Sequence, residues 1–447
     1  MKENKLLHNA KWIIVCKTLQ SLIQLAVGML SARYLGPSNY GLLNYAVAIA
    51  AVALPFVQLG LHEILVGEYV ENPDREGEIL GTALVMNMAS ALCCIAGVTV
   101  FASAANPGEP VTILVCALYS TGLLFQAMEM VQYWFQAKLL SKYASLAMLI
   151  AYVAVSAYKI LLLATGKSVC WFALAHGVEY GAAGFLLLAA YKKKGTQKLS
   201  FSAAAARQMF SKGKYYIASS LLVVAFQSTA SILVKLLTGT VENGCFAAAV
   251  TCTAVVQFVY HAIIDSARPV ILADKKADQN QFEKHISGLY CVIVYLSLGQ
   301  SVVFTVFAGP IMKLLYGAAY DAGIPVLRIL IWQTAFSYMG TVRNIWILAQ
   351  ERYDRLWVIN LCGALTNLAL NLWFIPVWGA CGAAAASLLT QIITNFVLGF
   401  LMKDIRPNNR LLLAGLHPRF AWRMLQNLTQ TVIRVYITKT GRILRKR

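Results

Sequence analysis

Residues Tyr191 to Lys214, with the sequence YKKKGTQKLSFSAAAARQMFSKGK, separate two long apolar regions of the chain. The stretch carries seven basic residues and no acidic one, whereas the regions on either side are successions of apolar runs. Basic connections between apolar runs are typical of the cytoplasmic side of membrane proteins. We therefore predict that this stretch is a cytoplasmic linker between two membrane-embedded halves.

The composition of the chain excludes an ordinary soluble domain. Apolar residues make up 59% of the 447 positions and charged residues only 13%, and the mean hydropathy is +0.63. The net charge of +19 would suit a nucleic-acid partner. However, the basic residues lie mostly in the connections between apolar runs, so we expect a membrane protein that binds no nucleic acid.

Twelve runs are long enough to span a bilayer, whose core of about 30 Å requires about 20 apolar residues per helix. They lie near 12–33, 42–66, 80–103, 111–136, 143–165, 168–190, 215–238, 245–267, 286–308, 324–349, 356–377 and 380–402. Because lipid offers backbone amides no water, each run must be helical. The expected fold class is an all-α polytopic membrane protein with about 12 transmembrane helices in two six-helix lobes.

The two halves begin in the same way, which predicts an internal duplication. In each half, an apolar run ends in a G-x-x-x-x-G turn, at Gly36 to Gly41 and at Gly239 to Gly244. The expected domains are an N-terminal lobe (1–190), a basic linker (191–214), a C-terminal lobe (215–402) and a basic amphipathic tail (403–447).

The distribution of lysine and arginine predicts the orientation. Of the 38 basic residues, 30 lie in the terminal segments and alternate connections of one side, whereas only Arg33, Lys167 and Lys313 lie in connections of the other. By the positive-inside rule, both termini are expected in the cytoplasm.

Five basic residues lie within the predicted helices: Lys17, Lys159, Lys235, Arg328 and Arg343. A charge at the centre of a spanning helix costs about 3 kcal/mol on insertion scales, so such a side chain faces a wet cavity or a partner, or snorkels to the headgroups. At about 1.5 Å per residue, two of them lie in the inner leaflet, Lys17 and Arg343. The other three lie toward the outside with Arg33 just beyond them, so the sequence predicts two cationic levels that hand over an anion.

Polar residues also recur at helical spacing. Lys17, Gln20, Ser21 and Gln24 share one face of the first predicted helix, which we expect to line the interior of the protein. His176 and Glu179 lie one turn apart near the middle of the sixth run. They are candidates for a proton relay, and the alternative is an ion pair that closes a helix contact.

Four stretches carry a resemblance to a known family. They are GALTNLALN at 363–371, IPVWGACGAA at 375–384, ARYLGPSNYG at 32–41 and EILGTA at 78–83. Together they resemble the polysaccharide flippases (oligosaccharide repeat-unit or O-antigen type) of the multidrug/oligosaccharidyl-lipid/polysaccharide exporter (MOP) superfamily. The resemblance implies the MATE-like MOP fold, two six-helix lobes around a central cavity, and alternating access.

The resemblance further implies a transporter and not an enzyme. Its cargo would be an undecaprenyl-pyrophosphate-linked oligosaccharide, flipped from the inner to the outer leaflet for O-antigen, capsule or exopolysaccharide synthesis. The location would be the cytoplasmic membrane of a bacterium or archaeon, with a polysaccharide polymerase and glycosyltransferases as further partners. No cofactor, metal or catalytic residue is expected, and H⁺, Na⁺ or the membrane potential would drive transport.

A pyrophosphate cargo requires fixed positive groups in the cavity to replace its hydration. The substrate-binding candidates are Lys17, Arg343, Lys159, Lys235, Arg328 and Arg33. Further polar lining would come from Gln20, Ser21, Gln24, Asn367 and Asn371, although the two asparagines also suit hydrogen bonds between helices. The coupling candidates are Glu179, His176 and Gln391, of which Gln391 stands where the family often has Glu.

Two alternatives remain open at the level of sequence. A multidrug or cation antiporter of the same fold would want an acidic residue in the first helix, where this chain has Lys17. A scaffold in polysaccharide assembly without transport would use the tail, whose Phe420, Met424, Leu428, Val432 and Val435 recur at helical spacing. That pattern predicts an amphipathic helix on the anionic inner leaflet.

The orientation can be tested by thiol labelling of intact cells after removal of the native cysteines. A cysteine placed at Thr196 should resist a membrane-impermeant reagent, because the linker is expected in the cytoplasm, whereas one at Ala319 should react. The reverse labelling would contradict the predicted orientation.

Overall fold

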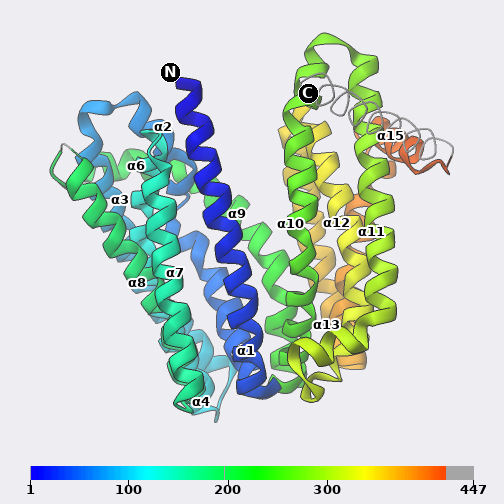
Figure 1. Cartoon of the computed structure of the whole chain (residues 1–447), viewed down its shortest axis with the longest axis horizontal. Helices are drawn as coiled ribbons and strands as arrows, with labels where there is room; N and C mark the ends of the chain where they lie inside the picture. Colours follow the sequence, from blue (N-terminus) through cyan, green and yellow to red (C-terminus); the bar gives the residue numbers. More distant parts are fainter. Residues whose placement is uncertain (1, 196, 419–447) are drawn as a thin grey trace, which may run out of the picture. The chain divides into compact units, whose positions relative to one another are not determined.

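The computed structural model describes residues 2–195 and 197–418, and all their regular elements are helical (Figure 1). The first half of the chain forms α1 (Lys2–Gln58), α2 (Leu61–Glu71), η1 (Pro73–Arg75), α3 (Glu76–Ala105), α4 (Pro110–Ser120), α5 (Gly122–Gln126), η2 (Ala127–Met130), α6 (Val131–Ala137), α7 (Ser141–Ala164) and α8 (Val169–Lys194). The second half forms α9 (Ala203–Thr238), α10 (Thr240–Ala277), α11 (Gln279–Tyr316), η3 (Ala318–Tyr320), α12 (Gly323–Ala349), α13 (Tyr353–Ile392), η4 (Ile393–Val397), α14 (Leu398–Leu401) and α15 (Arg406–Leu416). The prediction of an all-α membrane protein is confirmed.

Eight helical segments of the described chain are long and apolar enough to cross a membrane, or nine if a bent pair within α10 is one span. The count is lower than twelve for three reasons: two segments contain two predicted runs each, the run 245–267 lies in the bent pair, and the run 324–349 in α12 is not among these segments. Within the two segments that contain two runs each, α1 breaks at Gly36 and α13 breaks at Gly379, where the backbone leaves helical geometry. Apart from short breaks and single residues at their ends, the twelve predicted runs lie in helices.

Two predicted runs are not straight helices. The run 42–66 is interrupted by Leu59 and Gly60, with φ angles of 51° and 68°, and the run 111–136 is divided by the 3₁₀ turn η2. At the first break, a Cβ atom on Gly60 would lie 2.2 Å from the carbonyl oxygen of Gly213 on α9. Hydropathy reports that a segment lies in lipid, but such breaks depend on what the helix packs against.

The chain divides into two compact units. Among the described residues, unit 1 contains those up to Ala249 together with Gly309–Val326 and Asn367–Ala383, and unit 2 contains Val250–Ala308, Leu327–Thr366 and those from Ala384 onward. In unit 1, α1 lies beside α7 and α7 beside α8 (Figure 1). In unit 2, the core joins α10, α11, α12 and α13. The lobe boundaries at 190 and 215 stay a prediction.

The predicted linker contains a strap, residues 197–202, that is attached to the start of α3. The Oε1 atom of Gln197 accepts a hydrogen bond of 2.9 Å from the backbone amide of Gly77. At the other end of the strap, the amide of Ser202 donates to the Oγ1 atom of Thr82 over 3.0 Å. This segment of the linker is therefore bound to α3 in unit 1.

Two glycines one turn apart on α3 make room for the strap. A Cβ atom on Gly77 would lie 2.2 Å from the carbonyl oxygen of Lys198, and one on Gly81 would lie 2.4 Å from that of Ser200. Since no real Cβ atom approaches a carbonyl oxygen so closely, both positions require glycine in this packing. The EILGTA stretch thus has a structural role, because its Gly81 supports the strap and its next residue, Thr82, binds it.

Helix α15 extends the described chain beyond the last predicted span and packs into unit 2. The Oδ1 atom of Asn408 accepts a hydrogen bond of 3.0 Å from the hydroxyl of Tyr290, and the Nδ2 atom of Asn409 donates to the carbonyl oxygen of Phe396 over 3.0 Å. Just before α15, a hydrogen bond from Arg352 holds the pKa of Asp404 below its usual value. The predicted amphipathic positions 420–435 lie outside the described residues.

The strap can be tested with the same substitution at two glycines of α3. Gly81→Ala should lower the apparent thermal midpoint in detergent, because the added methyl group overpacks against the strap at a cost of about 1–3 kcal/mol. Gly97→Ala is the control, since a Cβ atom there meets no atom within 4 Å. Its midpoint should stay the same or rise with the helix propensity of alanine. Equal midpoints for both variants would argue against the strap contact.

Candidate functional site

Lys235 lies near the end of α9 with only 3% of its side chain exposed. Its ammonium group donates to the Oδ1 atom of Asn106 and to the Oε2 atom of Glu109 over 2.8 Å. It also lies 5.0 Å from the ring centroid of Tyr45, whose hydroxyl accepts a bond of 3.0 Å from Asn106. We call these four residues the Lys235 cluster. A buried cation is tolerated here because an anion, an amide oxygen and an aromatic face replace its water.

Glu109 differs from its partner because it is half exposed, with 49% of its side chain accessible. It lies in the short connection between α3 and α4, and Thr112 donates a second hydrogen bond of 2.6 Å to the same carboxylate oxygen. The hydrogen bond from Lys235 lowers the pKa of Glu109. Glu109 is therefore an anion that can be rehydrated by a small movement, whereas Lys235 cannot be rehydrated in this way.

The two predicted G-x-x-x-x-G turns have the same backbone conformation. The φ and ψ angles are 69° and 171° at Gly36, and 100° and 178° at Gly239. A positive φ combined with an extended ψ is a region that is essentially reserved for glycine. Each turn therefore requires the first glycine of its motif.

The two turns also pack against each other, and the contacts are reciprocal. A Cβ atom on Gly41 would lie 1.8 Å from the carbonyl oxygen of Thr240, and one on Gly244 would lie 1.9 Å from that of Pro37. In each case the second glycine of one motif meets the residue that follows the first glycine of the other. We call this contact, between 36–41 and 239–244, the glycine seam. Its reciprocity is what an internal duplication predicts.

Hydrogen bonds reinforce the glycine seam. The hydroxyl oxygens of Ser38 and Thr240 lie 3.0 Å apart. The Nδ2 atom of the buried Asn243 donates to the carbonyl oxygen of Gly41 over 2.7 Å, and Ser231 donates to its Oδ1 atom over 2.8 Å. The seam therefore joins α1 to the junction of α9 and α10 within unit 1.

Arg33 also lies near the end of the first span, but it is exposed. Its Nη2 atom donates to the carbonyl oxygens of Lys313 and Leu314 in the last turn of α11, where the helix dipole favours a cation. One residue earlier, the carbonyl oxygen of Ala32 accepts a bond of 2.6 Å from Tyr320. In this structure Arg33 acts as a helix cap.

The predicted stripe on α1 lies on the surface of unit 1. Lys17, Ser21 and Gln24 are exposed and Gln20 is half-buried. The hydroxyl of Ser21 donates to the carbonyl oxygen of Lys17 over 2.9 Å. The stripe is therefore accessible. That it lines a cavity stays a prediction.

The other two outer cations have different surroundings. Lys159 is half-buried on α7, within electrostatic reach of Glu179 on α8. Arg328 is exposed on α12 and belongs to unit 2. Lys159 therefore interacts electrostatically with a predicted coupling residue. Within the part of the chain that the structure describes, no side-chain contact joins Lys159 to Lys235 or Arg33.

His176 lies in an aromatic environment and not in a hydrogen-bonded relay. Its ring stacks on Tyr119 with centroids 4.2 Å apart and meets the edge of Tyr180 at 4.7 Å. Its buried Nε2 atom has no hydrogen-bond partner among the described residues, Glu179 included. The ring fills the space over Gly122, where a Cβ atom would lie 2.1 Å from it.

Arg343 is buried in unit 2, with 4% of the residue exposed. It donates to the carbonyl oxygen of Thr394 over 2.7 Å and to Asn344 over 3.1 Å. Thr394 lies in the π-helical turn η4, which disturbs the regular backbone hydrogen bonds. The next residue, Asn395, donates to Gln391. Arg343 and the coupling candidate Gln391 therefore both bind to this turn.

The predicted polar pair of Asn367 and Asn371 is buried, and Asn371 donates to the side-chain oxygen of Asn367 over 2.8 Å. Farther along α13, the IPVWGACGAA stretch breaks the helix at Gly379, where φ is 55°. The carboxylate of Glu242 occupies the space beside this glycine and accepts a bond of 2.6 Å from the amide of Ala380. In this structure, both stretches have packing roles.

Sequence reasoning named the cations but missed their partners. Only three acidic residues lie in the predicted outer connections: Glu109, Glu242 and Asp321. Glu109 binds Lys235, Glu242 caps the second half of α13, and Asp321 lies 3.6 Å from Lys313. Because so few acidic residues lie on that side, each of them is a candidate partner for a nearby cation. The sequence could have been used in this way to find the partner of Lys235.

The architecture is that of an all-helical polytopic membrane protein, and comparisons with known proteins show its family and its fold. A family described as "Polysaccharide biosynthesis protein" matches residues 6–273. Since this is more than half of the chain, the protein belongs to that family. A search of curated proteins found no match.

Solved structures show the same fold. A structure described as "Lipid II flippase MurJ, inward closed conformation" is 13% identical with a TM-score of 0.70, over 94% of this chain and 99% of its own. An inward-facing multidrug resistance MATE transporter of the MOP superfamily is 16% identical with a TM-score of 0.68, over 88% and 95%. A MOP superfamily transporter from Pyrococcus furiosus is 14% identical with a TM-score of 0.57, over 92% and 96%. The predicted MOP fold is confirmed.

The glycine seam can be tested by crosslinking. In a background without native cysteines, Ser38→Cys and Thr240→Cys together should form a disulfide on mild oxidation in membranes, because the native hydroxyl oxygens lie only 3.0 Å apart. Ser38→Cys combined with Ser103→Cys, an exposed residue in the last turn of α3, is the control. Cleavage between the two cysteines followed by non-reducing electrophoresis detects the bond. An equal yield in both pairs would contradict the seam.

Proposed function

We propose that this protein flips an undecaprenyl-pyrophosphate-linked oligosaccharide from the inner to the outer leaflet of a bacterial or archaeal cytoplasmic membrane, by alternating access. The product would serve the synthesis of O-antigen, capsule or exopolysaccharide, and both termini would lie in the cytoplasm. The observation that carries the proposal is the family match over 6–273, because that family concerns polysaccharide biosynthesis. The MOP fold supports transport as the activity.

The cations support an anionic cargo. A pyrophosphate carries several localised negative charges, and only fixed positive groups can replace the water that solvates them. Lys17 is exposed beside Ser21 and Gln24 on α1, so its ammonium group is accessible to such a ligand. An antiporter for cationic drugs would have little use for an exposed lysine at this place.

The roles of the two inner cations differ in this proposal. Lys17 would bind the pyrophosphate directly. Arg343 already donates to Thr394 and Asn344, but its Nε atom has no partner among the described residues. Arg343 would therefore offer the pyrophosphate its positive charge and its Nε donor, while it stays bound to Thr394 in the turn η4.

The energy source is proposed to be H⁺, Na⁺ or the membrane potential. Glu179 beside Lys159 is the candidate for coupling, because protonation of a carboxylate that interacts with a lysine changes the net charge of the pair. His176, packed between Tyr119 and Tyr180, and Gln391 are the further candidates. The polymerase and the glycosyltransferases of the same assembly would be the partners.

Charge neutralisation tests the proposal. At matched expression, Lys17→Gln should lower the export of lipid-linked units by about tenfold or more, because a charge-assisted bond to an anion is worth about 1.5–3 kcal/mol. Arg343→Gln should also lower export, and Arg343→Lys should keep part of it, because lysine retains the charge without the planar donors. The assay compares lipid-linked units accumulated on the inner face with those that appear outside.

The control is Lys167→Gln, which removes an exposed charge from the connection between α7 and α8. It should export like the wild type. Normal export by both Lys17→Gln and Arg343→Gln would end the proposed role of the inner cations.

A further inference from the structure

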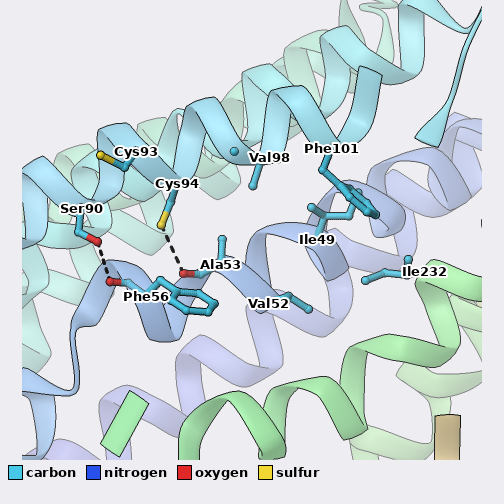
Figure 2. A pocket seen from close by; sticks show the side chains of 11 residues that line it. Ile49, Val52, Ala53, Phe56, Ser90, Cys93, Cys94, Val98, Phe101 and Ile232 are labelled. Carbon is cyan, nitrogen blue, oxygen red and sulfur yellow. Dashed lines mark hydrogen bonds between the residues drawn. The ribbon is translucent and has the colours of Figure 1, made fainter. Parts of the chain in front are cut away.

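Unit 1 contains a cavity of about 520 Å³ between the second half of α1, the middle of α3 and α9 (Figure 2). Its lining is almost wholly apolar and includes Ile49, Val52, Phe56, Val98, Phe101 and Ile232. The one hydroxyl in the lining, on Ser90, already donates to the carbonyl oxygen of Phe56 over 2.7 Å. The cavity therefore suits a hydrocarbon and offers little to a polar ligand.

One end of this cavity points toward the Lys235 cluster. Ile49 on α1 lies one turn after Tyr45, and Ile232 on α9 lies one turn before Lys235. Residues three or four apart share a helix face, so both polar residues continue the lining in the same direction. Figure 2 shows Ile49, Phe101 and Ile232 together at one end of the cavity, with Ser90 and Phe56 at the other. The cavity is thus an apolar groove with one end that points toward a buried cation.

We propose that this groove binds the polyprenyl chain of the transported lipid, while Lys235 binds its pyrophosphate in place of Glu109. The proposal rests on the proposed function for the identity of the lipid. The helix ends at Ala105 and Thr238, near which Lys235 lies, face outward in the predicted orientation. The groove would therefore hold the lipid on the outer side, after its transfer.

The exchange at Lys235 follows from the exposure of the two partners. The carboxylate of Glu109 is half exposed and can turn to water, whereas the ammonium group of Lys235, with 3% of its side chain exposed, needs an anion in its place. A pyrophosphate carries more charge and more acceptor oxygens than a carboxylate, so it competes well for this position. Asn106 can keep its bond to Lys235 during the exchange.

A polyprenyl lipid fits the groove better than a phospholipid does. The groove is one cavity that points toward one cation, and a polyprenyl pyrophosphate has a single chain for its headgroup. A phospholipid carries two chains, of which the second would stay outside. The volume of the groove holds only part of a long chain, so the rest would extend into the bilayer.

Gly97 provides a way to fill the groove without disturbing the protein. It belongs to the lining, and a Cβ atom on it would meet no atom within 4 Å. Gly97→Trp should therefore place its ring in the groove. Gly299→Trp is the matched control, because Gly299 is an exposed helical glycine of α11 with the same open surroundings, and it belongs to unit 2.

The test uses the full chain in proteoliposomes with a diazirine-bearing polyprenyl pyrophosphate as the probe. After irradiation, mass spectrometry should find the label on residues 49–56 and 90–101. Gly97→Trp should lower this labelling by about tenfold, and Gly299→Trp should leave it unchanged. Lys235→Met should lower labelling by the pyrophosphate probe about tenfold. It should not change labelling by the corresponding uncharged polyprenol. Glu109→Gln should increase labelling by the pyrophosphate probe.

Three results would overturn the proposal: a label elsewhere in the chain, unchanged labelling of Gly97→Trp, and competition by excess phosphatidylglycerol as strong as that by unlabelled polyprenyl pyrophosphate. Equally strong competition by phosphatidylglycerol would mean that the groove binds bulk lipid. Export of lipid-linked sugar is measured separately on the wild type. Export without a label in the groove rejects this site alone, whereas a label in the groove without export rejects the proposed function and keeps the lipid site.

Discussion

The glycine seam is the contact on which the arrangement of unit 1 depends. It allows two helix junctions, at 36–41 and 239–244, to approach until their backbones touch. A side chain larger than hydrogen at Gly41 or Gly244 would separate them. Because the seam brings α9 to α1, it also brings Lys235 to Tyr45, from where the ammonium group reaches Asn106 and Glu109 in the neighbouring connection.

The cations in the apolar helices of this protein are of two kinds, buried and exposed. Lys235 and Arg343 are buried, and each is surrounded by acceptors from its own unit: Glu109 and Asn106 for the lysine, and Thr394 and Asn344 for the arginine. Lys17, in contrast, is exposed. Cations with local acceptors stabilise the structure at rest and bind a ligand only by exchange, whereas an exposed cation can bind one directly. The six predicted cations are therefore not equivalent.

The stretches that carry the family resemblance are, in this structure, mainly packing devices. Gly81 makes room for the strap, Gly379 allows the backbone to turn beside Glu242, and Gly41 belongs to the seam. In a lipid environment the hydrophobic effect does not hold helices together, so close backbone contact at small residues takes its place. This accounts for the glycines that these stretches contain.

The sequence alone determined the class of protein, the twelve apolar runs, the turn glycines and the identity of the buried cations. These follow from local rules, since a bilayer accepts only apolar helices and a positive φ favours glycine. Only the tertiary structure decided that Lys235 pairs with Glu109, 126 residues away, that Arg343 holds η4, and that the strap at 197–202 is bound to α3. The physical reason is that the hydropathy of a spanning helix can be read from its own residues. The residues that pack against one of its faces depend on where other helices break. Such breaks depend in turn on contacts between distant residues, such as that of Gly60 with Gly213.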